Sequence, residues 1–169
     1  MSSLRINISK LSEGDHLYSL RTDPPDIGLD DRFDRNVEVE ASVEKANRQM
    51  LVRIEARAAG RFVCDRCLDE FRQDVKSELT IVYVQGGDHP EDLRQSQEFQ
   101  YLPPDVNIID LGEDVRQYLI LSLPLKMLCK EECAGLCPVC GSNRNTTACS
   151  CTAVESDPRW ATLKGFQDN

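Results

Sequence analysis

The stretch VEVEASVEKANRQMLVRIEARA, residues 37–58, alternates apolar and polar side chains with a period of two. Successive side chains of a β-strand point to opposite faces, so this pattern predicts two strands, 37–44 and 50–58, joined by a turn near Asn47. The polar set is mostly glutamate and arginine, and the apolar set is Val37, Val39, Ala41, Val43, Val52, Ile54 and Ala56. We therefore expect an antiparallel hairpin with one buried face and one face in water.

Further strands are predicted on both sides of this hairpin. Upstream, residues 4–8 alternate in the same way and indicate a short first strand. Downstream, Gly60 begins a third run at 61–63, and a fourth run covers 71–84. The sequence CDRC, residues 64–67, lies between the third and fourth runs. This cysteine pair is therefore expected at a turn between two strands.

Two segments are expected to be loops. Residues 22–34 hold two prolines, a glycine and five aspartates. Residues 86–114 hold eight acidic residues and one base, Arg94, which gives the segment a net charge of −7. Such a charge density favours solvation over packing, so most of residues 86–97 should form a solvated loop.

One helix is predicted after the acidic segment, from about Leu111 to Leu123. Asp110 and, three residues later, Glu113 form a capping-box pattern, and Pro124 ends the helix. The apolar positions that follow recur at helical spacing and are Leu111, Val115, Tyr118, Leu119 and Leu123. A second, short helix is predicted to begin at Asp157 and Pro158.

Length and composition limit the classes of function. The 169 residues correspond to about one domain. Twenty Lys and Arg stand against 29 Asp and Glu, a net charge of −9, which excludes a uniformly basic protein that binds nucleic acid through bulk charge. No apolar run is long enough for a signal peptide or a membrane helix, so we expect a cytoplasmic protein.

Eight cysteines form four close pairs, and this clustering is the main chemical signal of the sequence. In the reducing cytosol such pairs are metal ligands or redox groups more often than disulfides. Zinc takes four thiolate or imidazole ligands at tetrahedral corners, and both histidines lie far from the cysteines in sequence. The sequence therefore predicts two all-thiolate structural Zn²⁺ sites from Cys64, Cys67, Cys129, Cys133, Cys137, Cys140, Cys149 and Cys151.

The pairs can be grouped into two tetrads in three ways. Loop closure favours a compact local site from the pairs 137/140 and 149/151, with 64/67 joined to 129/133 as a long-range clasp. The alternative joins 129/133 to 137/140 and leaves 64/67 with 149/151. Spacing alone leaves this choice open, and it also leaves open an iron–sulfur cluster in place of zinc.

Other functions of the cysteines are less favoured. The pair Cys64 and Cys67 could instead switch between dithiol and disulfide in a thiol-redox or metal-responsive regulator, but it lies between two strands rather than at a helix N-terminus. Four thiolates per ion leave no open position for a substrate, which argues against catalytic zinc. A nuclease would need an acid cluster that the sequence does not offer.

The expected fold class is α+β. We expect an antiparallel sheet or partly closed barrel, one amphipathic helix and a cysteine-rich, zinc-binding C-terminal knuckle. Residues 1–123 would form the β-rich domain with its helix at about 111–123. Residues 124–169 would form the knuckle and the short C-terminal helix, packed as one unit with the first part.

These motifs resemble those of the bacterial YceD family, named for large ribosomal RNA subunit accumulation. The resemblance lies in CDRC at 64–67, LILSLPLKMLCKEECAGLCPVCG at 119–141 and DPRWATL at 157–163. The combination of C-x-R-C with L-P-x₄-C-x₃-C-x-G-L-C-x₂-C-G is specific, unlike any single C-x-x-C.

The resemblance implies a non-enzymatic factor for accumulation or processing of 23S rRNA and for assembly of the large ribosomal subunit. Its expected partner is the pre-ribosomal particle, through 23S rRNA or large-subunit ribosomal proteins, with no membrane and no small-molecule substrate. The acidic segment could offer a surface to basic ribosomal proteins. In that case deleting residues 86–97 would weaken association with ribosomal precursors.

Overall fold

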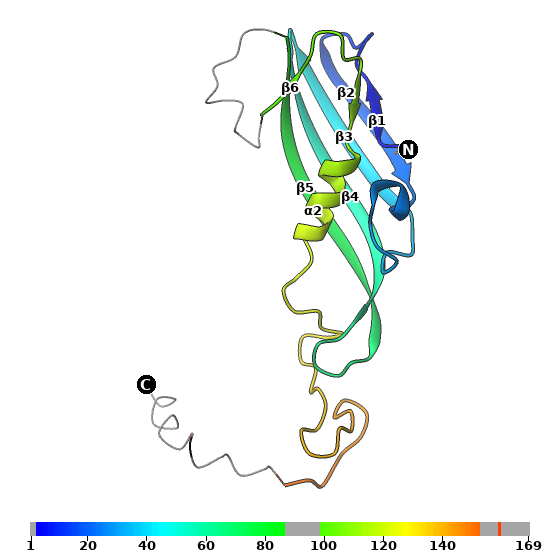
Figure 1. The fold of residues 1–169 in the computed structure, drawn as a ribbon, viewed down its shortest axis with the longest axis vertical. Coiled ribbons are helices and arrows are strands. Elements are labelled where there is room, and N and C mark those ends of the chain that lie inside the picture. Colours follow the sequence, from blue (N-terminus) through cyan, green and yellow to red (C-terminus); the bar gives the residue numbers. More distant parts are fainter. Residues whose placement is uncertain (1–2, 87–98, 153–158, 160–169) are drawn as a thin grey trace.

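A computed structural model describes residues 3–86, 99–152 and 159 (Figure 1). A five-stranded sheet in the order β2-β3-β4-β5-β6 is accompanied by a two-stranded sheet of β1 and β7. The elements are β1 (Arg5–Asn7), β2 (Gly14–Thr22), the 3₁₀ helix η1 (Pro24–Ile27), β3 (Val37–Ala46), β4 (Gln49–Val63), β5 (Glu70–Gln85), β6 (Phe99–Leu102), β7 (Ile108–Asp110) and α2 (Gly112–Leu121). No helix within these described ranges is long and apolar enough to cross a membrane.

The central hairpin forms as the alternation predicts. Strands β3 and β4 are antiparallel, with Val39 opposite Ala56 and Val43 opposite Val52. Asn47 adopts a left-handed conformation with φ 55° at the turn, a conformation that asparagine tolerates better than most residues. The apolar set of both strands is buried, and the glutamate and arginine set faces solvent.

Strand β4 is longer than the sequence predicts. The structure joins the expected runs 50–58 and 61–63 into one strand that passes through Gly60. A Cβ at this position would lie 2.7 Å from the backbone oxygen of Arg32, because the loop before β3 crosses β4 here and Phe33 forms a β-bridge with Gly60. The glycine therefore permits close backbone approach instead of ending the strand.

Strand β2 was not predicted from the sequence. It pairs with β3 at the edge of the sheet, with Gly14 opposite Lys45 and Thr22 opposite Val37. Its alternation is obscured because apolar Leu17 lies on the solvent face, 85% exposed, while Tyr18 and Leu20 are half-buried on the other. An edge strand packs on fewer neighbours, so its hydrophobic pattern is weaker.

Helix α2 covers the core face of the sheet. Leu111, Val115 and Leu119 are fully buried, whereas Tyr118, expected on the same apolar stripe, lies at its border and is 37% exposed. Asp110 accepts a hydrogen bond from the Gly112 N–H, but the Glu113 side chain binds Arg116 and Gln117, so the reciprocal capping box does not form.

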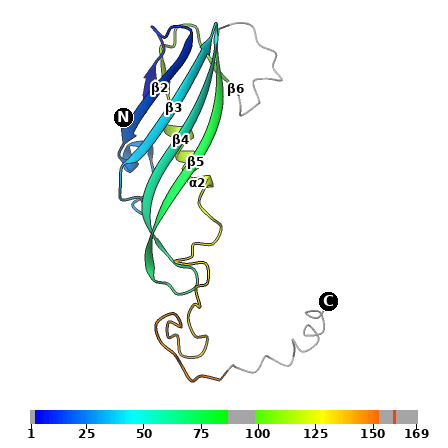
Figure 2. The ribbon, with the colours of Figure 1, turned by 180° about the vertical axis from the view of Figure 1, so that it is seen from behind.

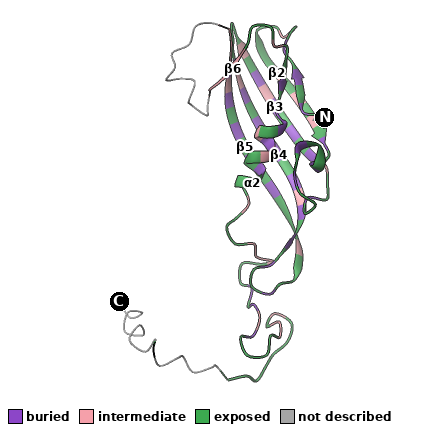
Figure 3. Cartoon of the chain, viewed as in Figure 1, coloured by how far each residue is buried: buried purple, intermediate pink, exposed green. Residues whose placement is uncertain are grey.

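The described elements form two layers. Helix α2, η1 and the β1–β7 pair lie over one face of the sheet in Figure 1, and Figure 2 shows the other face without such a cover in the described part of the chain. Figure 3 shows the same division as alternating buried and exposed positions along each strand. The described strands of the large sheet follow the open order β2-β3-β4-β5-β6 and do not close into a barrel, and the class is α+β.

The sheet is not purely antiparallel. Strand β6 runs parallel to β5, with Val82 opposite Phe99. Parallel neighbours need a connection long enough to return the chain, and the acidic residues between β5 and β6 supply that length. Residues 87–98, and hence most of the expected loop, lie outside the described residues, as does the short helix expected from Asp157.

Candidate metal centres

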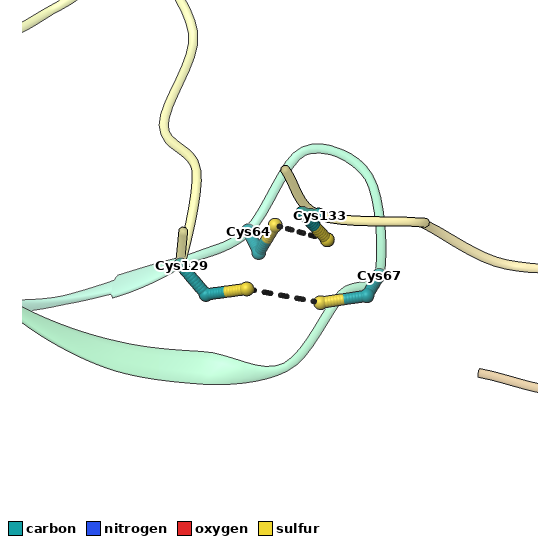
Figure 4. Close-up of side chains that lie close together, drawn as sticks. All are labelled: Cys64, Cys67, Cys129 and Cys133. Atoms are coloured by element: carbon teal, nitrogen blue, oxygen red, sulfur yellow. Dashed lines mark hydrogen bonds between the residues drawn. The ribbon is translucent and has the colours of Figure 1, made fainter. Parts of the chain in front are cut away.

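The first cluster joins the β4–β5 turn to the chain that follows α2. Its four sulfurs, from Cys64, Cys67, Cys129 and Cys133, lie within 4.8 Å of one another (Figure 4). The Sγ atoms of Cys64 and Cys133 are 3.7 Å apart, and those of Cys67 and Cys129 are 3.6 Å apart. A tetrahedral ion with metal–sulfur bonds of about 2.3 Å holds its sulfurs about 3.8 Å apart, so the cluster fits one metal ion.

Backbone and side-chain contacts hold the two halves of this cluster together. The Asp65 N–H donates to the Met127 carbonyl at 2.8 Å, and the Met127 N–H donates to the Asp65 carboxylate at 2.7 Å. Arg66 Nη1 donates to the Cys133 carbonyl at 3.0 Å. Cys64, Cys67 and Cys133 are buried, at 0%, 2% and 3% exposure. The cluster is thus an enclosed clasp between segments more than 60 residues apart in sequence.

The second cluster is local and more open. The sulfurs of Cys137, Cys140, Cys149 and Cys151 lie within 4.8 Å of one another, and only Cys137 is buried. The cysteine pairs therefore come together in the grouping that loop closure favours. All eight side chains are free thiols rather than disulfides.

Both C-x-x-C pairs adopt the same turn. In the first, the Cys64 N–H donates to Asp69 O at 2.9 Å and the Leu68 N–H donates to Cys64 O at 2.9 Å. In the second, the Cys137 N–H donates to Ser142 O at 2.8 Å and the Gly141 N–H donates to Cys137 O at 2.9 Å. Leu68 and Gly141 occupy the same left-handed position, with φ 62° and 72°. The sequence conceals this repeat because a leucine stands where glycine is usual.

The two clusters are packed against each other. The Leu136 N–H donates to Arg66 O at 3.0 Å, and Asn143 Nδ2 donates to the Asp69 carboxylate at 2.6 Å. Asn145 Nδ2 reaches Cys133 Sγ at 3.3 Å. Sequence reasoning missed both asparagines. The available signal was their position between two cysteine pairs, where an amide can donate to a thiolate.

The thiols of the first cluster differ in pKa. Burial raises the pKa of Cys64, but backbone N–H groups, first that of Cys129, donate to the sulfur and bring its pKa down to about 6. The Asp69 N–H lowers the pKa of Cys67, but burial and the neighbouring sulfurs together raise it by more, so the resulting pKa is about 12. One negative sulfur thus disfavours ionisation of the next, and a divalent cation among them would remove that repulsion.

In the second cluster the pKa values of Cys140 and Cys151 differ in the same way. The Ser142 side chain and backbone N–H lower the pKa of Cys140 to about 6. The hydrogen bond with Cys140 raises the pKa of Cys151 to about 12. Each cluster therefore holds a thiol of lowered pKa, Cys64 or Cys140, beside one of raised pKa, Cys67 or Cys151, and a bound cation would favour ionisation of the second.

Comparison with known proteins identifies the family. Residues 52–167 match the YceD family, described as large ribosomal RNA subunit accumulation protein YceD, and this span includes all eight cysteines. The chain belongs to the YceD family. No solved structure shows a significant match to this YceD chain.

Several curated proteins are similar in sequence to part of this YceD chain. Proteins of Mycobacterium bovis and Mycobacterium tuberculosis, both named only as uncharacterized proteins, are 29% identical over 100 residues, which cover 59% of this chain. The chain spans about half, 47%, of the length of these relatives. A maize protein, large ribosomal RNA subunit accumulation protein YCED homolog 1, chloroplastic, is 33% identical over 79 residues, 47% of this chain and 26% of the maize protein.

The donor sets of this YceD protein fit single metal ions. Sulfurs within 4.8 Å of one another suit one tetrahedral ion, whereas a multi-iron cluster holds its thiolates further apart. Each ion would use four thiolates, and this leaves no coordination position for a substrate. The clusters can therefore fix chain segments in place, and their geometry does not point to a reaction at the metal.

Gly135 provides a test of how this YceD protein holds its two clusters together. Its φ is 69°, and an added Cβ would lie 3.1 Å from Arg66 O. We expect Gly135→Ala to weaken the hydrogen bond from the Leu136 N–H to Arg66 O by about 2 kcal/mol. This change corresponds to roughly thirtyfold faster hydrogen exchange at the Leu136 amide.

Gly141→Ala is the matched control, because Gly141 has φ 72° but no atom within 4 Å of the added Cβ. It should accelerate exchange in its own turn and leave the Leu136 amide unchanged. Equal acceleration at Leu136 in both variants would show that the Arg66 contact does not fasten the clusters.

Proposed function

We propose that this chain is a non-enzymatic ribosome-biogenesis factor that supports 23S rRNA accumulation or processing and assembly of the large subunit. The family match over residues 52–167 is the observation that carries the proposal, together with the name of the maize relative. We expect the protein to act in the cytoplasm on a pre-ribosomal particle, through 23S rRNA or large-subunit ribosomal proteins.

We further propose that all eight cysteines bind two structural Zn²⁺ ions, so that residues 124–169 pack with residues 1–123 as one unit. The sulfur distances and the all-thiolate donor sets support this. Protein purified without chelator should contain close to two zinc ions per chain. Iron in place of zinc, or chains free of metal, would contradict the assignment.

A thiol-redox regulator that uses Cys64 and Cys67 has less support. Redox-sensing cysteines need access to an oxidant, but these two side chains are 0% and 2% exposed. A metal-responsive role would need the enclosed first cluster to release its ion readily. The open second cluster is the better candidate for such release, and it does not include this pair.

The test of the biogenesis role is depletion of the protein in the organism that encodes it. We expect 23S rRNA to fall relative to 16S rRNA, and expression of the wild-type chain to restore the ratio. A normal ratio of 23S to 16S rRNA after complete depletion would contradict the proposal. A fall of both rRNAs together would indicate a general growth effect instead.

A further inference from the structure

The face of the sheet opposite α2 is the one turned to the viewer in Figure 2. Strands β2 to β5 are antiparallel and in continuous register, so each row across the sheet takes one residue from each strand. One row has three cations and one acid: Arg21, Glu38, Arg57 and Lys76. The fold therefore concentrates positive charge locally in a chain of net charge −9.

A second pair of cations lies four residues further along the same two strands. Arg61 is directly opposite Arg72, as Arg57 is directly opposite Lys76. Four residues of a strand correspond to about 13 Å, so the two cation pairs are separated by about that distance along the sheet. We call the following residues the cationic band: Arg21, Arg35, Arg57, Arg61, Arg72 and Lys76.

Acidic neighbours only partly neutralise the band. Arg61 and Arg72 share the single carboxylate of Asp34, and Arg57 is bound by Glu55. Arg21 pairs with Glu38 at 3.9 Å, and exposed Asp74 lies between Arg72 and Lys76 on β5, so four acids stand beside the six cations. In the part of the chain that the structure describes, the side chains of Arg35 and Lys76 have no hydrogen bond or ion pair. Like charges directly opposite each other on a sheet repel, and the carboxylates of Asp34 and Glu55 offset only part of that repulsion.

The band also has a shape and a boundary. A hollow of about 290 Å³ is lined by four cations, Arg21, Arg35, Arg57 and Lys76, and by two acids, Glu38 and Asp74. The next row away from the cysteine clusters is Ser19, Glu40, Glu55 and Glu78, which carries three adjacent acids. An anion would therefore be held on the half of the face nearer the clusters and repelled from the other half.

We propose that the cationic band binds the phosphate backbone of RNA. Arginine and lysine side chains bind phosphate groups, and such contacts position a protein on nucleic acid without reading its sequence. The proposal rests on the proposed biogenesis function and deepens it, because it makes RNA rather than a ribosomal protein the direct partner of this face.

The test compares full-length variants for binding to a labelled RNA hairpin by fluorescence anisotropy at several salt concentrations. We expect Arg57→Gln with Lys76→Gln to reduce affinity about tenfold at low salt and to lower the slope of log K against log salt by about 2. Both side chains are exposed, so the fold should persist, and circular dichroism checks this.

The matched control is Lys10→Gln with Arg48→Gln, an equal change of net charge at exposed positions outside the band. It should change affinity less than about twofold. Equal losses in both variants would show that only bulk charge matters, and wild-type protein that does not bind the hairpin at low salt would also overturn the proposal.

A protein partner would give a different pattern. If Glu40→Gln with Glu78→Gln abolishes co-sedimentation with ribosomal precursors while the band variant still co-sediments, the face binds a basic protein and the proposal is wrong. Failure of the biogenesis function is distinguishable, because depletion would then leave 23S rRNA normal whatever the hairpin assay shows.

Discussion

Cys64→Ser is expected to lower the stability of the whole chain and to remove one of the two metal ions that we propose. Cys64 is fully buried in a cluster whose halves are 62 residues apart in sequence. In the chain-entropy model, a cross-link that closes a loop of that length stabilises the fold by about 4 kcal/mol, and a metal clasp acts in the same way. Urea unfolding and metal content per chain would measure both effects.

Cys140→Ser is the matched comparison, since it removes one ligand from the exposed, local cluster. We expect this variant to lose the other ion and the order of its own knuckle, with the unfolding midpoint of the sheet nearly unchanged. The difference arises because only the first cluster ties the segment after α2 to the β4–β5 turn. Equal, local effects in both variants would refute this distinction.

Leu119→Ala should produce the second large effect, a loss of about 2–5 kcal/mol in the free energy of unfolding. Leu119 is fully buried on α2, in line with Leu111 and Val115, and the helix contacts β4 and β5. Removing its side chain leaves a cavity where the helix meets the sheet. Urea-induced unfolding, followed by circular dichroism, measures the change.

Leu121→Ala is its control on the same helix. Leu121 is 77% exposed, and the substitution changes helix propensity in the same way, so stability should stay within about 0.5 kcal/mol of wild type. If Leu119→Ala lowers the free energy of unfolding no more than Leu121→Ala does, Leu119 does not pack between α2 and the sheet as described.

The strands and helix that the sequence predicts well are those whose side chains face a core on one side only. The period-two pattern of β3 and β4 and the helical spacing of Leu111, Val115 and Leu119 report directly on burial. Edge strand β2 lacks that signal because Leu17 faces solvent. The sequence predicts a new run after Gly60, because a glycine in a strand marks either the end of the strand or a close approach of another backbone segment. Only the position of the Arg32 carbonyl against Gly60 distinguishes the two.

The sequence by itself determined the local chemistry of this protein: four cysteine pairs, a hairpin with one wet face, an amphipathic helix and the family motifs. Only the tertiary structure decided which pairs of cysteines meet and which charges share a row. Both depend on contacts between segments far apart in the chain, and spacing along the sequence does not specify them. The register of β4 with β5 sets Arg57 beside Lys76, and the turn after β4 brings Cys64 to Cys133, because the packing of the sheet fixes where each strand ends.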